Sequence, residues 1–167
     1  MFQVDDMVLY PMHGVGVIEA IEEKEVLGKS ELYYILNMPQ IRMQIMIPIE
    51  KATSLGIRQL VDPEVLENVL TDFHLGNTDP IVYKDQRYCR DFNNKKIKTG
   101  DIYKETEIIR DLSRKSQRDK LGAEDTNMLN SARRMFISEL MQVKGIAQEQ
   151  ADHLLDEILL SSRYETV

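Results

Sequence analysis

The one stretch of the sequence that is rich in basic residues runs from Tyr83 to Arg134. Between Lys84 and Arg134 it holds fourteen Lys/Arg against nine Asp/Glu, although the whole chain has a formal net charge of −7. Tyr83 and Tyr88 lie among these cations. Cations replace condensed counterions at nucleic-acid phosphates, and an aromatic ring stacks on a base or wedges beside one. The stretch therefore predicts a nucleic-acid contact; on composition alone, a Lys-rich solvated helical face is the alternative explanation.

No set of residues has the spacing of a catalytic or metal site. His13, His74 and His153 form no His-x-x-x-His or Glu-x-x-His pair. Cys89 is the single cysteine, which excludes an internal disulfide and a thiolate zinc site. Gly14-Val15-Gly16 lacks the third glycine of a dinucleotide-binding loop. We expect no enzymatic activity, metal, cofactor or small-molecule substrate, unless groups such as His13, Cys89 and a distant carboxylate converge in space.

Length and composition indicate a folded protein of one or two small domains. The 167 residues are 43% apolar and 29% charged, which is ordinary globular composition. No apolar run reaches the roughly 18 residues of a membrane span, and the N-terminus lacks a signal-peptide pattern. We expect a cytoplasmic location and no membrane partner. Residues 1–76 hold five Lys/Arg and twelve Asp/Glu, whereas residues 77–167 hold sixteen of each, so the halves are expected to meet different partners.

The first fifty residues have the pattern of short strands. Val4–Tyr10, Gly14–Ile21 and Leu32–Leu36 are rich in apolar and β-branched residues, with turn residues between them. Closely spaced strands with no helix between them predict a small antiparallel β-barrel of SH3 or Tudor type over residues 1–55. Barrels of this kind usually bind other proteins.

The last predicted strand alternates in residue type. Its apolar positions are predicted to face inward: Met43, Ile45, Ile47 and Ile49. The intervening positions are predicted to face outward: Arg42, Gln44, Met46 and Pro48. An exposed Met46 indicates a surface for a partner. Pro48 cannot donate to a β ladder, so it is expected on an edge or at the end of the strand.

After the strands, the apolar period becomes helical. Asp62-Pro63 supplies an N-cap and a first-turn proline for one helix. A second helix is expected over Tyr83–Asn94, and Asp101 is the expected N-cap of a third. Two further helices follow. We expect an α+β fold whose second domain, residues 62–167, is a compact bundle of about five helices, with a boundary near residues 52–61.

Short motifs occur in a specific order along essentially the whole chain. The first runs from Asp6 to Ile21 and reads DMVLYPMHGVGVIEAI. The others are Leu27-Gly28-Lys29, Ile47-Pro48, Gly56-Ile57-Arg58, Arg87-Tyr88, Lys98-Thr99-Gly100-Asp101, Arg110-Asp111-Leu112, Ala132-Arg133 and Glu139-Leu140. In this order and combination they resemble the CarD/CdnL family of bacterial RNA polymerase-binding transcription regulators.

The resemblance implies a two-part adaptor. A Tudor-like domain would bind the lobe of the RNA polymerase β subunit, while the helical domain touches promoter DNA at the upstream bubble edge, with little sequence specificity, and stabilises the open complex. The expected polymerase-binding residues are Lys24, Arg42, Gln44 and Met46. The expected DNA-binding residues are Tyr83, Arg87, Tyr88, Arg90, Lys95, Lys96 and Arg133. The alternative is an adaptor whose helical domain binds another protein, or a second copy of itself, and not DNA.

The chain departs from the family pattern at three places. The family typically has a wedge tryptophan near the start of the second bundle helix, and this chain has no tryptophan. Tyr83 is the expected substitute, although an ungapped register places Gln86 there. Ser131 replaces a basic residue before Ala132-Arg133, and Met46 replaces an arginine. These changes bear on the DNA and polymerase contacts and not on the fold.

Overall fold

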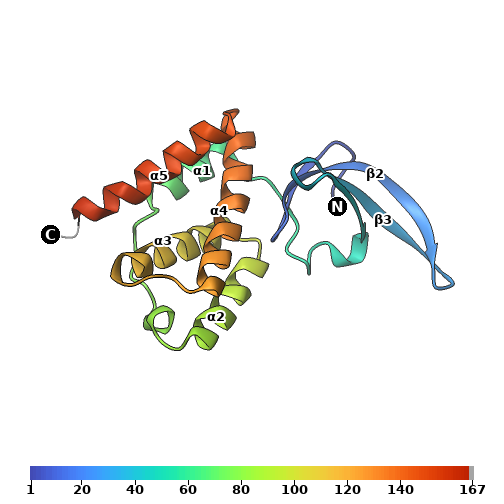
Figure 1. Ribbon diagram of the computed structural model, residues 1–167. Coiled ribbons are helices and arrows are strands. Elements are labelled where there is room, and N and C mark those ends of the chain that lie inside the picture. Colours follow the sequence, from blue (N-terminus) through green and yellow to red (C-terminus); the bar gives the residue numbers. More distant parts are fainter. Residues whose placement is uncertain (166–167) are drawn as a thin grey trace.

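The computed structural model describes the backbone of residues 1–165 and the side chains of residues 1–161. Within this part of the chain, a five-stranded antiparallel sheet is followed by five α-helices (Figure 1). This confirms the α+β fold with the strands first. Residues 166–167, at the end of the expected helical domain, lie outside the described residues.

The sheet is formed by the N-terminal segment. Its strands are β1 (Met7–Tyr10), β2 (Gly14–Val26), β3 (Lys29–Met38), β4 (Met43–Pro48) and β5 (Arg58–Gln59). They lie in the order β4-β3-β2-β1-β5, and each neighbouring pair is antiparallel. β2 and β3 form a long hairpin that projects away from the helices (Figure 1). β5 continues the sheet past residue 55, where the first domain is expected to end.

The inner face of the sheet packs around Tyr34, Leu36 and Ile47. β4 is an edge strand, and Pro48 lies at its end, where the missing N–H costs no ladder bond. Met43 pairs with the buried Met38 on the inner face, but its side chain is 54% exposed, so the prediction that it belongs to the core is wrong. Met43 begins the edge strand directly after the turn that ends at the left-handed residue 42 (φ 51°), and it therefore lies beyond the core that Ile47 enters.

The helical domain follows the expected order. Its helices are α1 (Pro63–Thr71), α2 (Gln86–Lys98), α3 (Ile102–Arg118), α4 (Ala123–Lys144) and α5 (Gln148–Glu165), and the 3₁₀ turn η3 (Pro80–Tyr83) precedes α2. Pro63 begins α1, and the Asp101 carboxylate accepts a hydrogen bond from the first turn of α3, as predicted. The second helix does not begin at Tyr83, because the Asp85 carboxylate caps the backbone two residues later.

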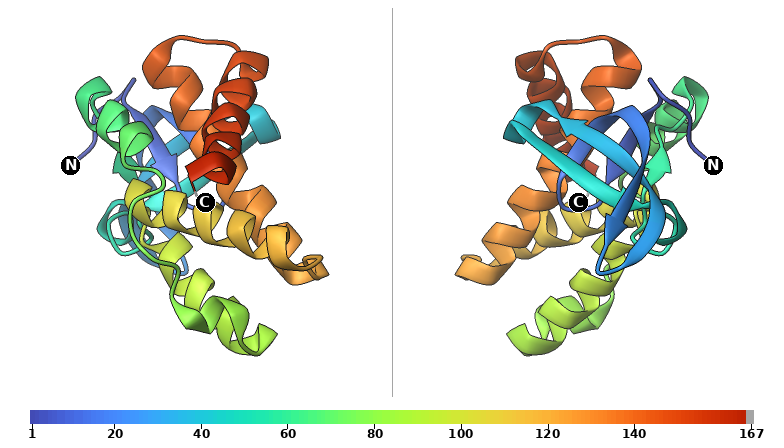
Figure 2. Two further views of the ribbon diagram at one scale, coloured as in Figure 1. Left: turned by 90° about the vertical axis from the view of Figure 1, so that its left-hand side faces the viewer. Right: turned by 90° about the vertical axis from the view of Figure 1, so that its right-hand side faces the viewer.

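One apolar core spans both domains. α4 packs against the other four helices and against β2, and its buried side chains include Met135, Phe136 and Leu140. Leu9 of β1 and Val15 of β2 belong to the same cluster as these helical residues. Figure 2 shows the N-terminal part of α2 and the junction of α3 with α4 projecting from the bundle toward the same side. Among the described helices, none combines the length and hydropathy needed to cross a membrane.

Candidate nucleic-acid and protein interfaces

α2 has one buried side and one exposed side. Its buried positions recur every four residues: Cys89, Asn93 and Ile97. The opposite side is exposed and carries Arg87, Tyr88, Lys95 and Lys98, which we call the α2 stripe. Asp91 lies on the same side, with its carboxylate 3.6 Å from Arg90 Nε. Tyr88 is 61% exposed, so its ring is open to a partner. The sequence prediction missed Lys98, although the helical period counted from Lys95 places both residues on one face.

Two of the predicted DNA-binding cations on α2 already contact carboxylates. Arg90 Nη1 lies 3.1 Å from Glu124 Oε1 at the start of α4. Lys96 Nζ lies 2.8 Å from Glu107 Oε2 on α3. Burial of Glu107 opposes its ionisation, but the pair with Lys96 lowers the pKa of this carboxyl below its usual value. A phosphate would have to compete with these partners, so Arg90 and Lys96 are weaker candidates than the α2 stripe.

Arg133 lies apart from the α2 stripe. It belongs to α4, and its guanidinium Nη2 is 2.9 Å from Asp156 Oδ1 and 3.8 Å from Asp152 Oδ1, both on α5. Its side chain is only 24% exposed. The structure therefore does not bring Arg133 together with the other predicted DNA-binding residues.

Several other cations of the basic stretch have structural roles. Arg110 and Arg114 of α3 donate hydrogen bonds to backbone carbonyls of the loop between α1 and η3. Lys115 Nζ lies 2.6 Å from the buried carboxylate of Asp125. For these residues, the positive charge stabilises contacts within the fold.

Tyr83 does not present a free ring. It ends η3 and is half-buried, and the guanidinium carbon of Arg118 lies 4.1 Å from the centroid of its ring. Gln86, the other candidate for the position of the family tryptophan, is the first residue of α2 and is exposed. Tyr83 is therefore covered by Arg118, and Gln86 is exposed but has no aromatic ring. Tyr88, one turn into α2, is the exposed aromatic residue of this region.

Three of the four predicted polymerase-binding residues share the outer face of the sheet. The register of β2, β3 and β4 places Lys24, Gln44 and Met46 on the face opposite the core. Met46 is 46% exposed and pairs with the buried Ile35 of β3. Arg42 is exposed but lies in the turn before β4 and not in the strand. The outer face therefore combines apolar and polar groups, as protein-binding surfaces do.

A buried ionic cluster joins the two domains. Arg58 of β5 donates from Nη1 and Nη2 to the two carboxylate oxygens of Glu139 on α4, at 2.7 and 2.8 Å. Glu139 Oε2 also accepts the Val61 N–H at 2.8 Å. Glu105 Oε2 of α3 lies 3.4 Å from Arg58 Nη2. Burial, followed by the neighbouring Glu139 carboxylate, raises the pKa of Glu105 well above its usual range.

Close backbone contacts complete this joint. Gly56 and Gly100 have positive φ angles of 77° and 73°, and a Cβ at Gly100 would overlap the Gly56 carbonyl. Ser138 Oγ of α4 accepts a hydrogen bond from the Val15 N–H of β2 at 2.9 Å. At positions 56 and 100, only glycine permits both the left-handed backbone and the close approach of the two backbone segments. The orientation of the sheet relative to the helices is therefore fixed by specific contacts.

The side chains that could take part in catalysis lie on separate segments of the fold. His13 lies in the turn after β1, His74 follows α1, and His153 lies on α5. Burial, assisted by the nearby Asp125 carboxylate, raises the pKa of the Cys89 thiol to about 11, so the thiol stays protonated at neutral pH. Within the described part of the chain, no group of three His, Cys, Asp or Glu residues is placed to hold a metal ion.

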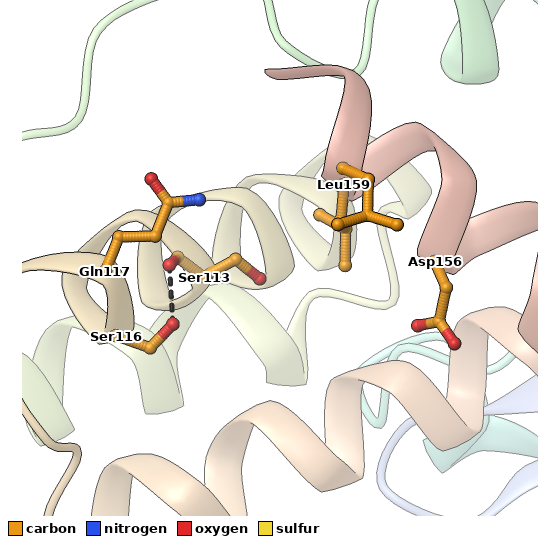
Figure 3. A pocket seen from close by; sticks show the side chains of 6 residues that line it. Ser113, Ser116, Gln117, Asp156 and Leu159 are labelled. Atoms are coloured by element: carbon orange, nitrogen blue, oxygen red, sulfur yellow. Dashed lines mark hydrogen bonds between the residues drawn. The ribbon is translucent and has the colours of Figure 1, made fainter. Parts of the chain in front are cut away.

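A shallow hollow of about 300 Å³ lies between α3 and α5. The residues that line it are Ser113, Ser116, Gln117, Asp156, Leu159 and Leu160. Figure 3 shows Ser116 Oγ donating to the Ser113 carbonyl at 2.6 Å, so this hydroxyl is engaged in its own helix. Asp156 pairs with Arg133. The hollow therefore offers no assembled nucleophile or acid–base pair.

Comparisons with known proteins cover both domains. The family model described as CarD-like/TRCF RID domain matches residues 2–61, and that described as CarD, C-terminal domain matches residues 76–156. The chain is 42% identical over 150 residues to the "Putative transcription factor YdeB" of Bacillus subtilis (strain 168), covering 90% of this chain and 97% of that protein. The solution NMR structure of the 72-residue N-terminal domain of Myxococcus xanthus CarD is 30% identical, with a TM-score of 0.31, and covers 35% of this chain and 79% of its own.

Proposed function

Because the chain belongs to the CarD family of transcription regulators, we propose that it docks on the β subunit of RNA polymerase and stabilises the promoter open complex. The sheet domain makes the polymerase contact, and the helical domain holds DNA at the upstream edge of the bubble. The protein is a transcription regulator and not an enzyme. The observation that carries the proposal is the α2 stripe, an exposed cationic face on a chain of net charge −7.

The outer face of the sheet supports the polymerase contact. Met46 gives it an exposed apolar side chain, while Lys24 and Gln44 add polar groups on the same face. The strands of this domain lie in an acidic segment, since residues 1–76 hold five Lys/Arg against twelve Asp/Glu. Such a surface repels nucleic acid and suits a protein partner, which leaves the DNA contact to the helices.

The α2 stripe supports the DNA contact. Arg87, Lys95 and Lys98 have no ion pair within residues 1–161, in contrast to Arg90 and Lys96. Each is free to replace a counterion at a phosphate without first leaving a carboxylate. Phosphate contacts carry little sequence information, so the protein acts at many promoters and takes its position from polymerase. Binding to free DNA is expected to be weak, because the chain as a whole is acidic.

The test is the lifetime of a promoter open complex formed by the bacterium's own RNA polymerase. The wild-type protein is expected to lengthen it, and the double variant Arg87→Gln, Lys95→Gln is expected to lose most of this effect. The control is Gln148→Glu with Gln150→Glu on α5, which changes the net charge by the same amount at exposed positions. Equal lifetimes for the two double variants would remove DNA contact by α2 from the proposal.

A protein adaptor is the second candidate function. It is favoured by the absence of tryptophan from the chain and by the half-buried placement of Tyr83 beneath Arg118. In that case polymerase still binds the sheet domain, while the open-complex lifetime is the same with and without the protein. The salt dependence separates the two functions, since phosphate contacts weaken steeply with ionic strength and an apolar contact does not.

A further inference from the structure

A second group of cations lies beside the N-terminal end of α2. Lys84 follows η3, Arg118 ends α3, and Lys120 lies in the turn between α3 and α4; all three are exposed. The Arg118 guanidinium lies over the Tyr83 ring at 4.1 Å, Lys84 follows Tyr83 in the chain, and Lys120 lies two residues after Arg118. We call Lys84, Arg118 and Lys120 the basic end.

The two carboxylates that neighbour the basic end in the chain each accept a hydrogen bond from the backbone. The Asp85 carboxylate accepts the Arg87 N–H at 2.8 Å, and the Asp119 carboxylate accepts the Lys120 N–H at 2.8 Å. The three cations of the basic end have no ion pair among the side chains of residues 1–161. Arg90, Lys96 and Arg133, in contrast, each form an ion pair with a carboxylate of the fold.

The basic end is also held in place. A Cβ on Gly122 would lie 2.7 Å from Gln86 Nε2, so the turn between α3 and α4 packs closely on the first residue of α2. Stacking on Tyr83 restricts the Arg118 guanidinium, and a restricted cation loses less side-chain entropy when it binds. Gln86 directly precedes Arg87, so the turn between α3 and α4 lies next to the N-terminal end of the α2 stripe.

We infer that the basic end is a second phosphate-binding surface for duplex DNA, with Tyr83 as the platform beneath Arg118 and not as a wedge between bases. The inference rests on the proposed function and deepens it. Two elements then contact the DNA backbone, α2 through its stripe and the junction of α3 with α4 through Arg118 and Lys120. Proximity to the α2 stripe, the proposed DNA contact, favours DNA phosphates over an acidic protein.

The first experiment measures salt dependence. For each protein, the ratio of the Kd for polymerase alone to the Kd for the polymerase–promoter complex isolates the DNA contribution. Each lost phosphate contact lowers the slope of log K against log salt by about 0.9. Raising the salt from 50 to 200 mM lowers the Kd ratio of the wild-type protein. For Arg118→Gln with Lys120→Gln, which removes two phosphate contacts, this fall is expected to be about tenfold smaller than in wild type. The control is again Gln148→Glu with Gln150→Glu.

The second experiment maps the contact directly. Lys120→Cys is labelled with an iron-chelate cleaving reagent, and Cys89 stays unlabelled because it is fully buried and its pKa is raised to about 11. Hydroxyl radicals from position 120 are expected to cut promoter DNA in the polymerase complex. Glu149→Cys, at an exposed position on α5, is the labelled control and is expected to cut no DNA.

The outcomes separate this inference from the proposed function. If Arg87→Gln with Lys95→Gln reduces the salt slope while Arg118→Gln with Lys120→Gln does not, the basic end is not a phosphate site and the proposed function stands. If neither pair changes the slope, DNA contact by α2 also fails. Cuts in a polymerase subunit from position 120, with none in DNA, would overturn the inference in favour of a protein contact.

Discussion

Replacing Glu105 by Gln should make the stability of the protein less dependent on pH. Glu105 is fully buried at the domain joint, and among the described residues its Oε1 has no hydrogen-bond partner. Its pKa is raised in the folded protein, first by burial and then by the Glu139 carboxylate. The folded state therefore binds this proton more tightly than the unfolded state, in which the pKa is near 4.5.

The sign of the effect follows from this difference. The stabilisation that the bound proton contributes is fully present below the unfolded-state pKa and is lost as pH rises toward the folded-state pKa. A single proton gives a slope of about 1.4 kcal/mol per pH unit in that window. Gln is nearly isosteric with protonated Glu and does not ionise. The difference in unfolding free energy, Glu105→Gln minus wild type, should therefore grow as pH rises above about 4.5, at up to this slope.

Urea unfolding followed by circular dichroism at pH 5, 6, 7 and 8 measures this difference. Glu107→Gln on the same helix is the matched control, because the pair with Lys96 lowers the Glu107 pKa and its contribution should be constant from pH 6 to 8. A constant destabilisation by Glu105→Gln at every pH would refute the reasoning. Glu105 would then be ionised throughout and would act as a second anionic partner of Arg58.

Further changes test the joint, the thiol and the polymerase surface. Arg58→Met leaves the buried Glu139 carboxylate without its cation and should lower the unfolding free energy by about 3 kcal/mol in a urea titration. Gly100→Ala strains a residue with φ of 73° and should cost about 2 kcal/mol in the same assay. Cys89 should react with a thiol reagent only after denaturation, as a colorimetric titration would show. Met46→Glu should weaken polymerase binding about tenfold by calorimetry, whereas an unchanged Kd would exclude the outer face of β4.

Local signals in the sequence predicted most of the fold. Pro63 marks a helix start through its fixed φ, and Asp101 marks one through a carboxylate that caps the next turn, whereas the Asp62 side chain makes no capping hydrogen bond. The alternation around Ile45 and Ile47 likewise marks a strand from neighbouring residues alone. Met43 continued that alternation but is exposed, since its burial depends on where the neighbouring core ends. Periodicity reports which face a residue occupies and not how far a core extends.

The candidate site was less predictable because its decisive contacts are distant in sequence. Arg90 meets Glu124, and Arg133 meets Asp156, across 34 and 23 positions. No local pattern distinguishes these paired cations from the unpaired Lys95. The stacking of Arg118 on Tyr83 is hidden for the same reason. Charge counts therefore located the basic stretch, while the three-dimensional pairing determines which of its cations remain available to a partner.

The joint around Arg58 and Glu139 has a consequence for where the protein acts on a promoter. A flexible link between two binding domains spreads the second domain over many positions and lowers its effective concentration at each one. A joint fixed by a bidentate ion pair and by apposed glycines concentrates α2 at a single position relative to the docked sheet. In the proposed complex, the rigid chain fixes the distance between the polymerase contact and the DNA contact. The site of DNA contact is then set by this distance and not by base sequence.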